Sequence, residues 1–120
     1  MERAEAAAVL KRSHNCCQAV LLAYADVLDM DETQLLQLGR CFGAGMGCMK
    51  GTCGALVGAQ IVLSLLGGST LQARTLHGSF EQRCGASICA DLKGIGTGNV
   101  LCPCDDCVRN AVLALEELRK

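Results

Sequence analysis

Apolar side chains recur at helical spacing through the first thirty residues of the chain. They follow one another at intervals of seven, four, three and four residues, which places them on one face of a helix. The members of this face are Leu10, Cys17, Leu21, Tyr24 and Leu28. Polar residues around Asp29 end the pattern, so the sequence predicts one long amphipathic helix from Glu2 to Met30.

Two shorter helices are predicted in the middle of the chain. A helix over 31–42 is expected because an acidic cap residue is followed three residues later by a glutamine. Residues 53–66 are apolar on almost every side, which predicts a buried central helix capped by Thr52. Within it, Gly54 and Gly58 lie four residues apart, a spacing that lets a neighbouring helix approach closely.

The C-terminal half continues the helical pattern. Ser69 or Thr70 is expected to open a helix that runs to about Lys93, and Pro103 suits the first turn of a last helix. Two glycine-rich loops, at 39–51 and around 94–98, separate these elements. Because no segment alternates as a half-buried strand does, the predicted fold is all-α: a compact bundle of four to five helices.

Composition restricts both the size of the fold and its partners. A chain of 120 residues with 51% hydrophobic and 19% charged residues suits one domain spanning residues 1–120. The net charge is -1, and only one Tyr and two Phe are present, so we expect no nucleic-acid partner. The longest apolar stretch, 55–66, is shorter than the roughly 20 residues that cross a bilayer, so the protein is not expected to span a membrane.

Ten cysteines are the unusual feature of the composition. The first residues include the charged Glu2, Arg3 and Glu5 and do not match the pattern of a secretory signal peptide, so we expect a cytoplasmic protein. In a reducing compartment, dense cysteine indicates metal or redox chemistry rather than a disulfide scaffold.

The cysteines divide by their place in the predicted elements. Cys17 and Cys84 lie on apolar helix faces and are assigned to core packing. Cys53 opens the central helix, where the helix dipole is expected to favour its thiolate form. In the last helix, Cys104 is expected on the buried face and Cys107 nearer its edge.

Known cysteine motifs explain little of this pattern. Cys104 and Cys107 form a Cys-x-x-Cys pair, but no second pair of that spacing exists, which disfavours a zinc ribbon. The residue after the pair is Val108 rather than histidine, so covalent haem attachment is unsupported.

Four sequence pieces read together resemble the family of redox-active proteins named for a C, GCAxxG, C, C pattern. They begin at Asn15-Cys16-Cys17, Cys53-Gly54-Ala55-x-x-Gly58, Cys89-Ala90-Asp91 and Cys104-Asp105-Asp106, with Thr52 in place of the family's first glycine. The family consists of small helical proteins and is similar to the N-terminal part of split-Soret cytochrome c, a dimer whose corresponding part carries an iron-sulfur cluster. The resemblance implies that Cys16, Cys53, Cys89 and Cys104 ligate such a cluster. Further candidate ligands are Cys107, Cys48, Cys41 and Cys17.

Three functions remain open from the sequence. The first is an electron-transfer or redox-sensing protein with a [2Fe-2S] or [4Fe-4S] cluster held by four thiolates and an unidentified electron donor or acceptor as partner. The resemblance implies a homodimer. The second is a metal-free protein that exchanges disulfides or carries sulfur through Cys53. The third is a copper buffer that binds soft metal through thiols together with Met46 or Met49. No catalytic residue is assigned, and enzymatic activity is left open.

Overall fold

The computed structural model describes residues 1–120 and contains seven α-helices. A 3-10 turn at Arg40–Phe42 and a π-helical turn at Gly45–Met49 lie between the third and fourth helices, and there are no strands. The all-α prediction is therefore confirmed, whereas the predicted count of four to five helices is wrong. The helices are α1 (Arg3–Leu10), α2 (Cys16–Ala23), α3 (Glu32–Gly39), α4 (Gly54–Leu65), α5 (Thr70–Cys84), α6 (Cys89–Lys93) and α7 (Cys104–Arg119).

The extra helices arise because two predicted helices are interrupted. The chain turns between α1 and α2, and Asn15 begins α2 with a capping box in which its side chain accepts a hydrogen bond from the Gln18 amide. α5 ends at Cys84 because Gly85 adopts a φ of 95°, which continues no right-handed helix. Helical periodicity carried across both interruptions, so hydrophobic spacing alone did not reveal them.

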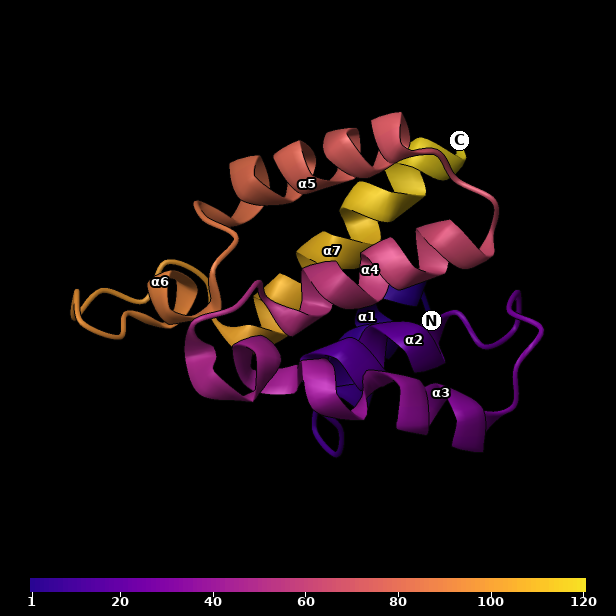
Figure 1. Cartoon of the computed structure of the whole chain (residues 1–120), viewed down its shortest axis with the longest axis horizontal. Coiled ribbons are helices and arrows are strands. Elements are labelled where there is room, and N and C mark those ends of the chain that lie inside the picture. The colour runs from indigo at the N-terminus through magenta and orange to yellow at the C-terminus, as the bar shows by residue number, and fades with distance from the viewer.

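α4 lies in the middle of the molecule, with α2, α5 and α7 packed against it (Figure 1). The close approach of α2 depends on Gly58, where an added Cβ would stand 2.9 Å from the Cys17 carbonyl oxygen and 3.0 Å from the Val20 Cβ. The predicted role of Gly54 and Gly58 in a tight helix crossing is confirmed. No helix combines the length and hydropathy that a bilayer crossing requires.

The first glycine-rich segment folds against the start of α6. Three non-glycine residues in it, Ala44, Met46 and Met49, have positive φ angles, a costly conformation for side chains with a Cβ. Gly45 also has a positive φ, and a Cβ there would stand 2.5 Å from the Cys89 Cβ. The segment is thus a specialised loop pressed against a cysteine.

Candidate metal centre

Four helices begin around one cavity, and a cysteine stands at the start of each. Cys16, Cys89 and Cys104 are the first residues of α2, α6 and α7, and Cys53 is the N-cap of α4. All four line a cavity of about 220 Å³. The remaining residues of its wall are Lys11, Asn15, Ala44, Met49, Gly54 and Lys93. The residues implied by the family resemblance therefore converge on one space, and we call them the cavity thiols.

Backbone pairing fixes two of the cavity thiols relative to each other. Thr52 and Ile88 form an isolated antiparallel bridge. The Cys53 amide donates to the Ser87 carbonyl at 2.8 Å, and the Cys89 amide donates to the Gly51 carbonyl at 3.0 Å. The sequence predicted that Thr52 caps α4, and this is wrong. Thr52 instead joins two segments, and the N-cap of α4 is Cys53, which makes no side-chain cap bond.

Asn15 holds the neighbouring Cys16 in position. Its side-chain amide donates to the carbonyls of Gly39 and Arg40, both at 3.2 Å, in addition to its cap bond on α2. These bonds tie the start of α2 to the end of α3. The position of Cys16 is consequently set by polar contacts as well as by the close crossing of α2 and α4.

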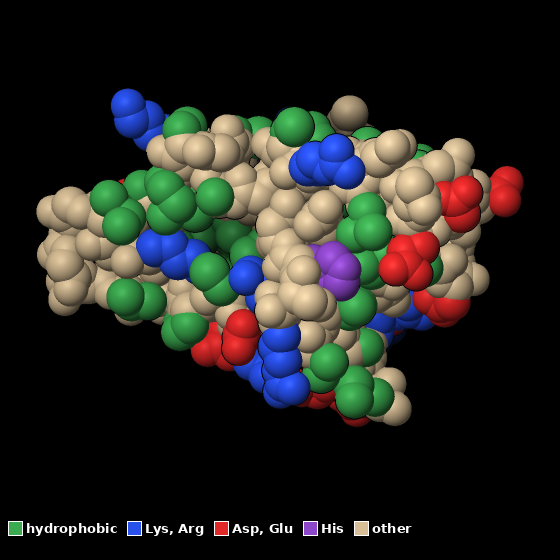
Figure 2. Space-filling view, turned by 90° about the horizontal axis from the view of Figure 1, so that it is seen from below, with side chains coloured by type: hydrophobic (Ala, Val, Ile, Leu, Met, Phe, Trp, Pro, Cys, Tyr) green, Lys and Arg blue, Asp and Glu red, His purple; other side chains and the backbone are tan.

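Positive charge surrounds the cavity. The N-terminal ends of α2, α4 and α7 carry the positive end of each helix dipole, and the side chains of Lys11 and Lys93 also line the wall. On the face in Figure 2, hydrophobic side chains gather toward the α6 end around a hollow, with Lys and Arg side chains beside it. Such an environment stabilises thiolates and an anionic metal centre.

Cys104, rather than Cys53, is the thiol most easily ionised. A hydrogen bond from the Cys16 thiol, together with the charge of Lys93, lowers the pKa of Cys104 to about 5. The pKa of Cys53 is instead raised, because its thiol donates a hydrogen bond to Cys107 and because it is buried; the amides of α4 only partly oppose this. Helix position does favour the Cys53 thiolate through these amides, as expected, but the Cys107 contact and burial outweigh it.

A second group of thiols lies outside the cavity wall. The sulfur atoms of Cys84, Cys102 and Cys107 are all within 4.8 Å of one another, and all three residues are buried. We call this group the buried trio. Cys107 is fully buried whereas Cys104 is partly exposed, which reverses the order predicted for these two residues of α7.

The other cysteines belong to neither group. Cys17 is fully buried against the α2–α4 crossing, and burial raises its pKa to about 12, consistent with its assignment to core packing. Cys41 and Cys48 are exposed and line no part of the cavity. Of the four further candidate ligands, only Cys107 lies in a group of thiols.

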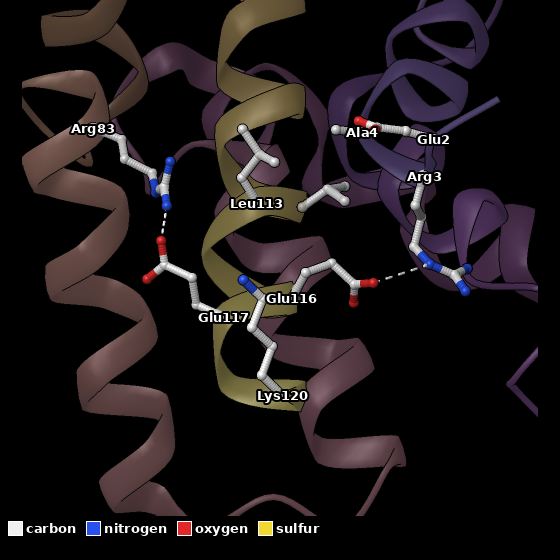
Figure 3. A pocket seen from close by; sticks show the side chains of 9 residues that line it. Glu2, Arg3, Ala4, Arg83, Leu113, Glu116, Glu117 and Lys120 are labelled. Carbon is white, nitrogen blue, oxygen red and sulfur yellow. Dashed lines mark hydrogen bonds and ion pairs between the residues drawn. The ribbon is translucent and has the colours of Figure 1, made fainter.

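The largest hollow of the surface, about 510 Å³, contains no sulfur. It lies among α1, α5 and α7, where Arg83 pairs with Glu117 and Arg3 with Glu116 (Figure 3). Four of its charged side chains are thus already paired with one another, whereas Glu2 and Lys120 of its wall form no ion pair. The candidate site is therefore defined by its chemistry rather than by the size of its cavity.

A family model described as "Putative redox-active protein (C_GCAxxG_C_C)" matches residues 14–118. The chain belongs to this family. The match spans all four cavity thiols and the buried trio. No curated protein and no solved structure shows a significant match to the chain.

Within this C_GCAxxG_C_C protein, sequence reasoning missed Cys84 and Cys102 as members of a thiol group. Cys84 was assigned to packing because it lies on an apolar helix face, and it is indeed part of the core. The missing signal was the end of α5 at Gly85, which brings Cys84 opposite the start of α7. The local clue in the sequence was a glycine directly after Cys84, a residue type that commonly ends a helix; in the structure Gly85 has a positive φ.

Proposed function

We propose that this protein is an electron-transfer or redox-sensing protein that holds an iron-sulfur cluster through Cys16, Cys53, Cys89 and Cys104. The observation that carries the proposal is the convergence of four cysteines from four helix starts on one cavity. An all-sulfur donor set of four thiolates is the usual ligation of [2Fe-2S] and [4Fe-4S] clusters. Membership of a redox-active family supports the same function.

The cavity residues suit an anionic group of this kind. The helix N-termini and the two lysines offset negative charge, and the pKa of Cys104 favours the thiolate that a metal ligand must become. Such a cluster, when bound, supplies one-electron transfer. Around it, Met49 and Ala44 of the strained loop would limit the access of water, which tunes the reduction potential.

The experiment is purification without oxygen, followed by iron, sulfide, copper and zinc analysis and electron paramagnetic resonance. We expect about two to four iron atoms per cluster with matching sulfide. Cys89→Ser should lower iron per chain at least tenfold, because this thiol lies in the cavity wall and outside the buried trio. Cys41→Ser is the matched control, since Cys41 is exposed and remote from the wall. Colourless protein with stoichiometric copper or zinc would contradict the proposal.

We extend the proposal to a homodimer working in a reducing cytoplasm, where ten free thiols persist. The resemblance to the N-terminal part of split-Soret cytochrome c supports a dimer. Three exposed apolar side chains in the segment after α6, Ile95, Val100 and Leu101, support contact with a second copy at that end of the molecule. Light scattering should give twice the chain mass, and Val100→Asp should give the single chain mass while the equally exposed Leu71→Asp leaves the dimer intact.

A further inference from the structure

The buried trio is a group of sulfur donors that the iron-sulfur proposal does not use. Cys84 ends α5, Cys102 precedes α7, and Cys107 lies in the first turn of α7, so two stretches of chain, the end of α5 and residues 102–107, bring the thiols together. They are between 0% and 4% exposed. None of them lines the cavity, although the Cys53 thiol reaches Cys107 from the cavity side.

Two nitrogen donors are directed at these sulfurs. The Lys93 ammonium lies 3.3 Å from the Cys107 sulfur, and it also donates to the Cys102 carbonyl at 3.0 Å. The Asn110 side-chain amide donates to the Cys84 sulfur at 3.4 Å and lies 3.9 Å from the Cys102 sulfur. Donors that point at sulfur atoms orient thiolate ligands and stabilise their negative charge.

The donor set decides the kind of metal. All three ligands are sulfur, and no histidine or carboxylate joins the group. Structural zinc sites almost always have four ligands, whereas copper(I) is a soft ion that two or three thiolates can satisfy. We propose that Cys84, Cys102 and Cys107 form a second metal site that binds one copper(I) ion per chain in a three-sulfur arrangement. The proposal is independent of the iron-sulfur cluster.

The geometry requires little movement to form this site. Three sulfurs bound at about 2.3 Å, the usual length for thiolate to a first-row metal, stand about 4 Å apart in a trigonal arrangement. The present separations are all within 4.8 Å, so the sulfurs need to approach by less than about 1 Å. Three thiolates and one copper(I) leave two negative charges, and Lys93 beside Cys107 offsets one of them.

The test uses a background in which the cavity cannot bind copper. Chelator-treated, oxygen-free Cys16→Ser/Cys89→Ser/Cys104→Ser protein is titrated with copper(I) against the competing chelator bicinchoninate. We expect one copper per chain, with three sulfur neighbours in X-ray absorption. Adding Cys102→Ser should weaken binding at least tenfold, whereas adding Cys41→Ser, a change at an exposed thiol outside both groups, should leave the affinity unchanged. Equal copper binding in both variants would overturn the proposal.

A second experiment measures thiol protection in the wild-type chain, so its result does not depend on whether these variants fold. In chelator-treated wild-type protein, held in a mild denaturant concentration at which the copper-free trio thiols are labelled, one equivalent of copper(I) should protect all three trio cysteines from alkylation, read by peptide mass spectrometry. Asn110→Ala keeps every thiol but removes the amide donor to Cys84, so it should weaken copper binding severalfold. Protection confined to the cavity thiols, or tighter binding of zinc(II) than of copper(I) at the trio, would overturn the proposal.

Discussion

The cavity thiols and the buried trio lie side by side but are built by different means. Each cavity thiol stands at a helix start, positioned by a cap, a backbone bridge or a close helix crossing, and lysine side chains share the wall. The trio is held inside the hydrophobic core, where α5 packs against α7. At the cavity, three helix N-termini and two lysines supply positive potential, whereas the trio has one ammonium, that of Lys93 beside Cys107, in an otherwise apolar environment. The comparison predicts that the cavity thiols depend more on electrostatics and the trio more on the stability of the core.

Cys53 is where the two groups meet. It lines the cavity, yet its thiol donates a hydrogen bond to Cys107 of the trio. Since Cys53 is only 1% exposed, this contact is shielded from solvent. A change at this position should therefore affect the cavity directly and the trio indirectly.

The largest expected effect is that of Cys53→Ser on the cavity. Loss of one of four thiolates should reduce iron per folded chain at least tenfold, because a serine hydroxyl is a poor ligand for iron-sulfur clusters. The helical content should remain close to that of wild type, since one small buried sulfur contributes little to packing. Iron analysis and circular dichroism on oxygen-free protein measure both. Full iron retention in this variant would remove Cys53 from the site.

The second prediction separates the cavity thiols by their acidity in metal-free protein. The pKa of Cys104 is lowered to about 5 by the Cys16 hydrogen bond and by Lys93, whereas burial and the neighbouring Cys53 raise the pKa of Cys89. Because the thiolate is the reactive form, Cys104 should be alkylated at least tenfold faster than Cys89 at neutral pH. Its rate should fall only as the pH decreases toward about 5.

Lys93→Gln is the check on that explanation. Removal of the ammonium should move the midpoint of the Cys104 rate profile to higher pH, since one of its stabilising charges is gone. A profile for Cys104 that rises only above pH 8, as for an ordinary thiol, would contradict the electropositive description of the cavity.

The third prediction concerns the helix crossing that sets the distance between Cys16 and Cys53. Gly58→Ala places a methyl group 2.9 Å from the Cys17 carbonyl, so the free energy of unfolding should decrease by about 1 to 3 kcal/mol. Gly78→Ala is the matched control: it lies within α5 with no atom within 4 Å of the added Cβ, and it should increase stability by about 0.5 to 1 kcal/mol. Denaturant unfolding measures both, and equal signs would refute the close crossing.

Much of the fold could be predicted from local signals in the sequence. The apolar segment of α4, the pair Gly54 and Gly58, and the capping box at Asp31 each predicted what the structure contains. The breaks at Asn15 and Gly85 were missed because the apolar spacing continues across them, although Asn15 is followed three residues later by Gln18, the same capping pattern that predicted the helix start at Asp31. The number of helices is therefore set by the residues that cap and end helices, and the hydrophobic pattern alone does not predict it.

The family resemblance named all four cavity thiols from the sequence. Two of them could be singled out without it: Cys53 by its position at a helix start, and Cys89 because it lies about 140° around the predicted helix from Cys84, off the apolar face. Their acidity could not be predicted, because the pKa of Cys104 depends on Cys16 and Lys93, which are distant in sequence. The trio was missed for the same reason: Cys84 and Cys107 meet only through the packing of α5 on α7. The glycine pair of the close helix crossing could be recognised in the sequence, whereas the contacts between cysteines of different helices could not.

The smallest expected effect is that of Cys84→Ser, which tests whether the trio is independent of the cavity. Cys84 lies in the core outside the cavity wall, so iron per folded chain should stay at the wild-type value. Burial of a hydroxyl costs free energy, but the Asn110 amide already donates to this position and can satisfy the new oxygen. The free energy of unfolding should thus decrease by only about 1 kcal/mol in denaturant titration. If Cys84→Ser instead lost its iron while Cys53→Ser kept it, the trio rather than the cavity would hold the cluster, and the placement of ligands at helix starts would be wrong.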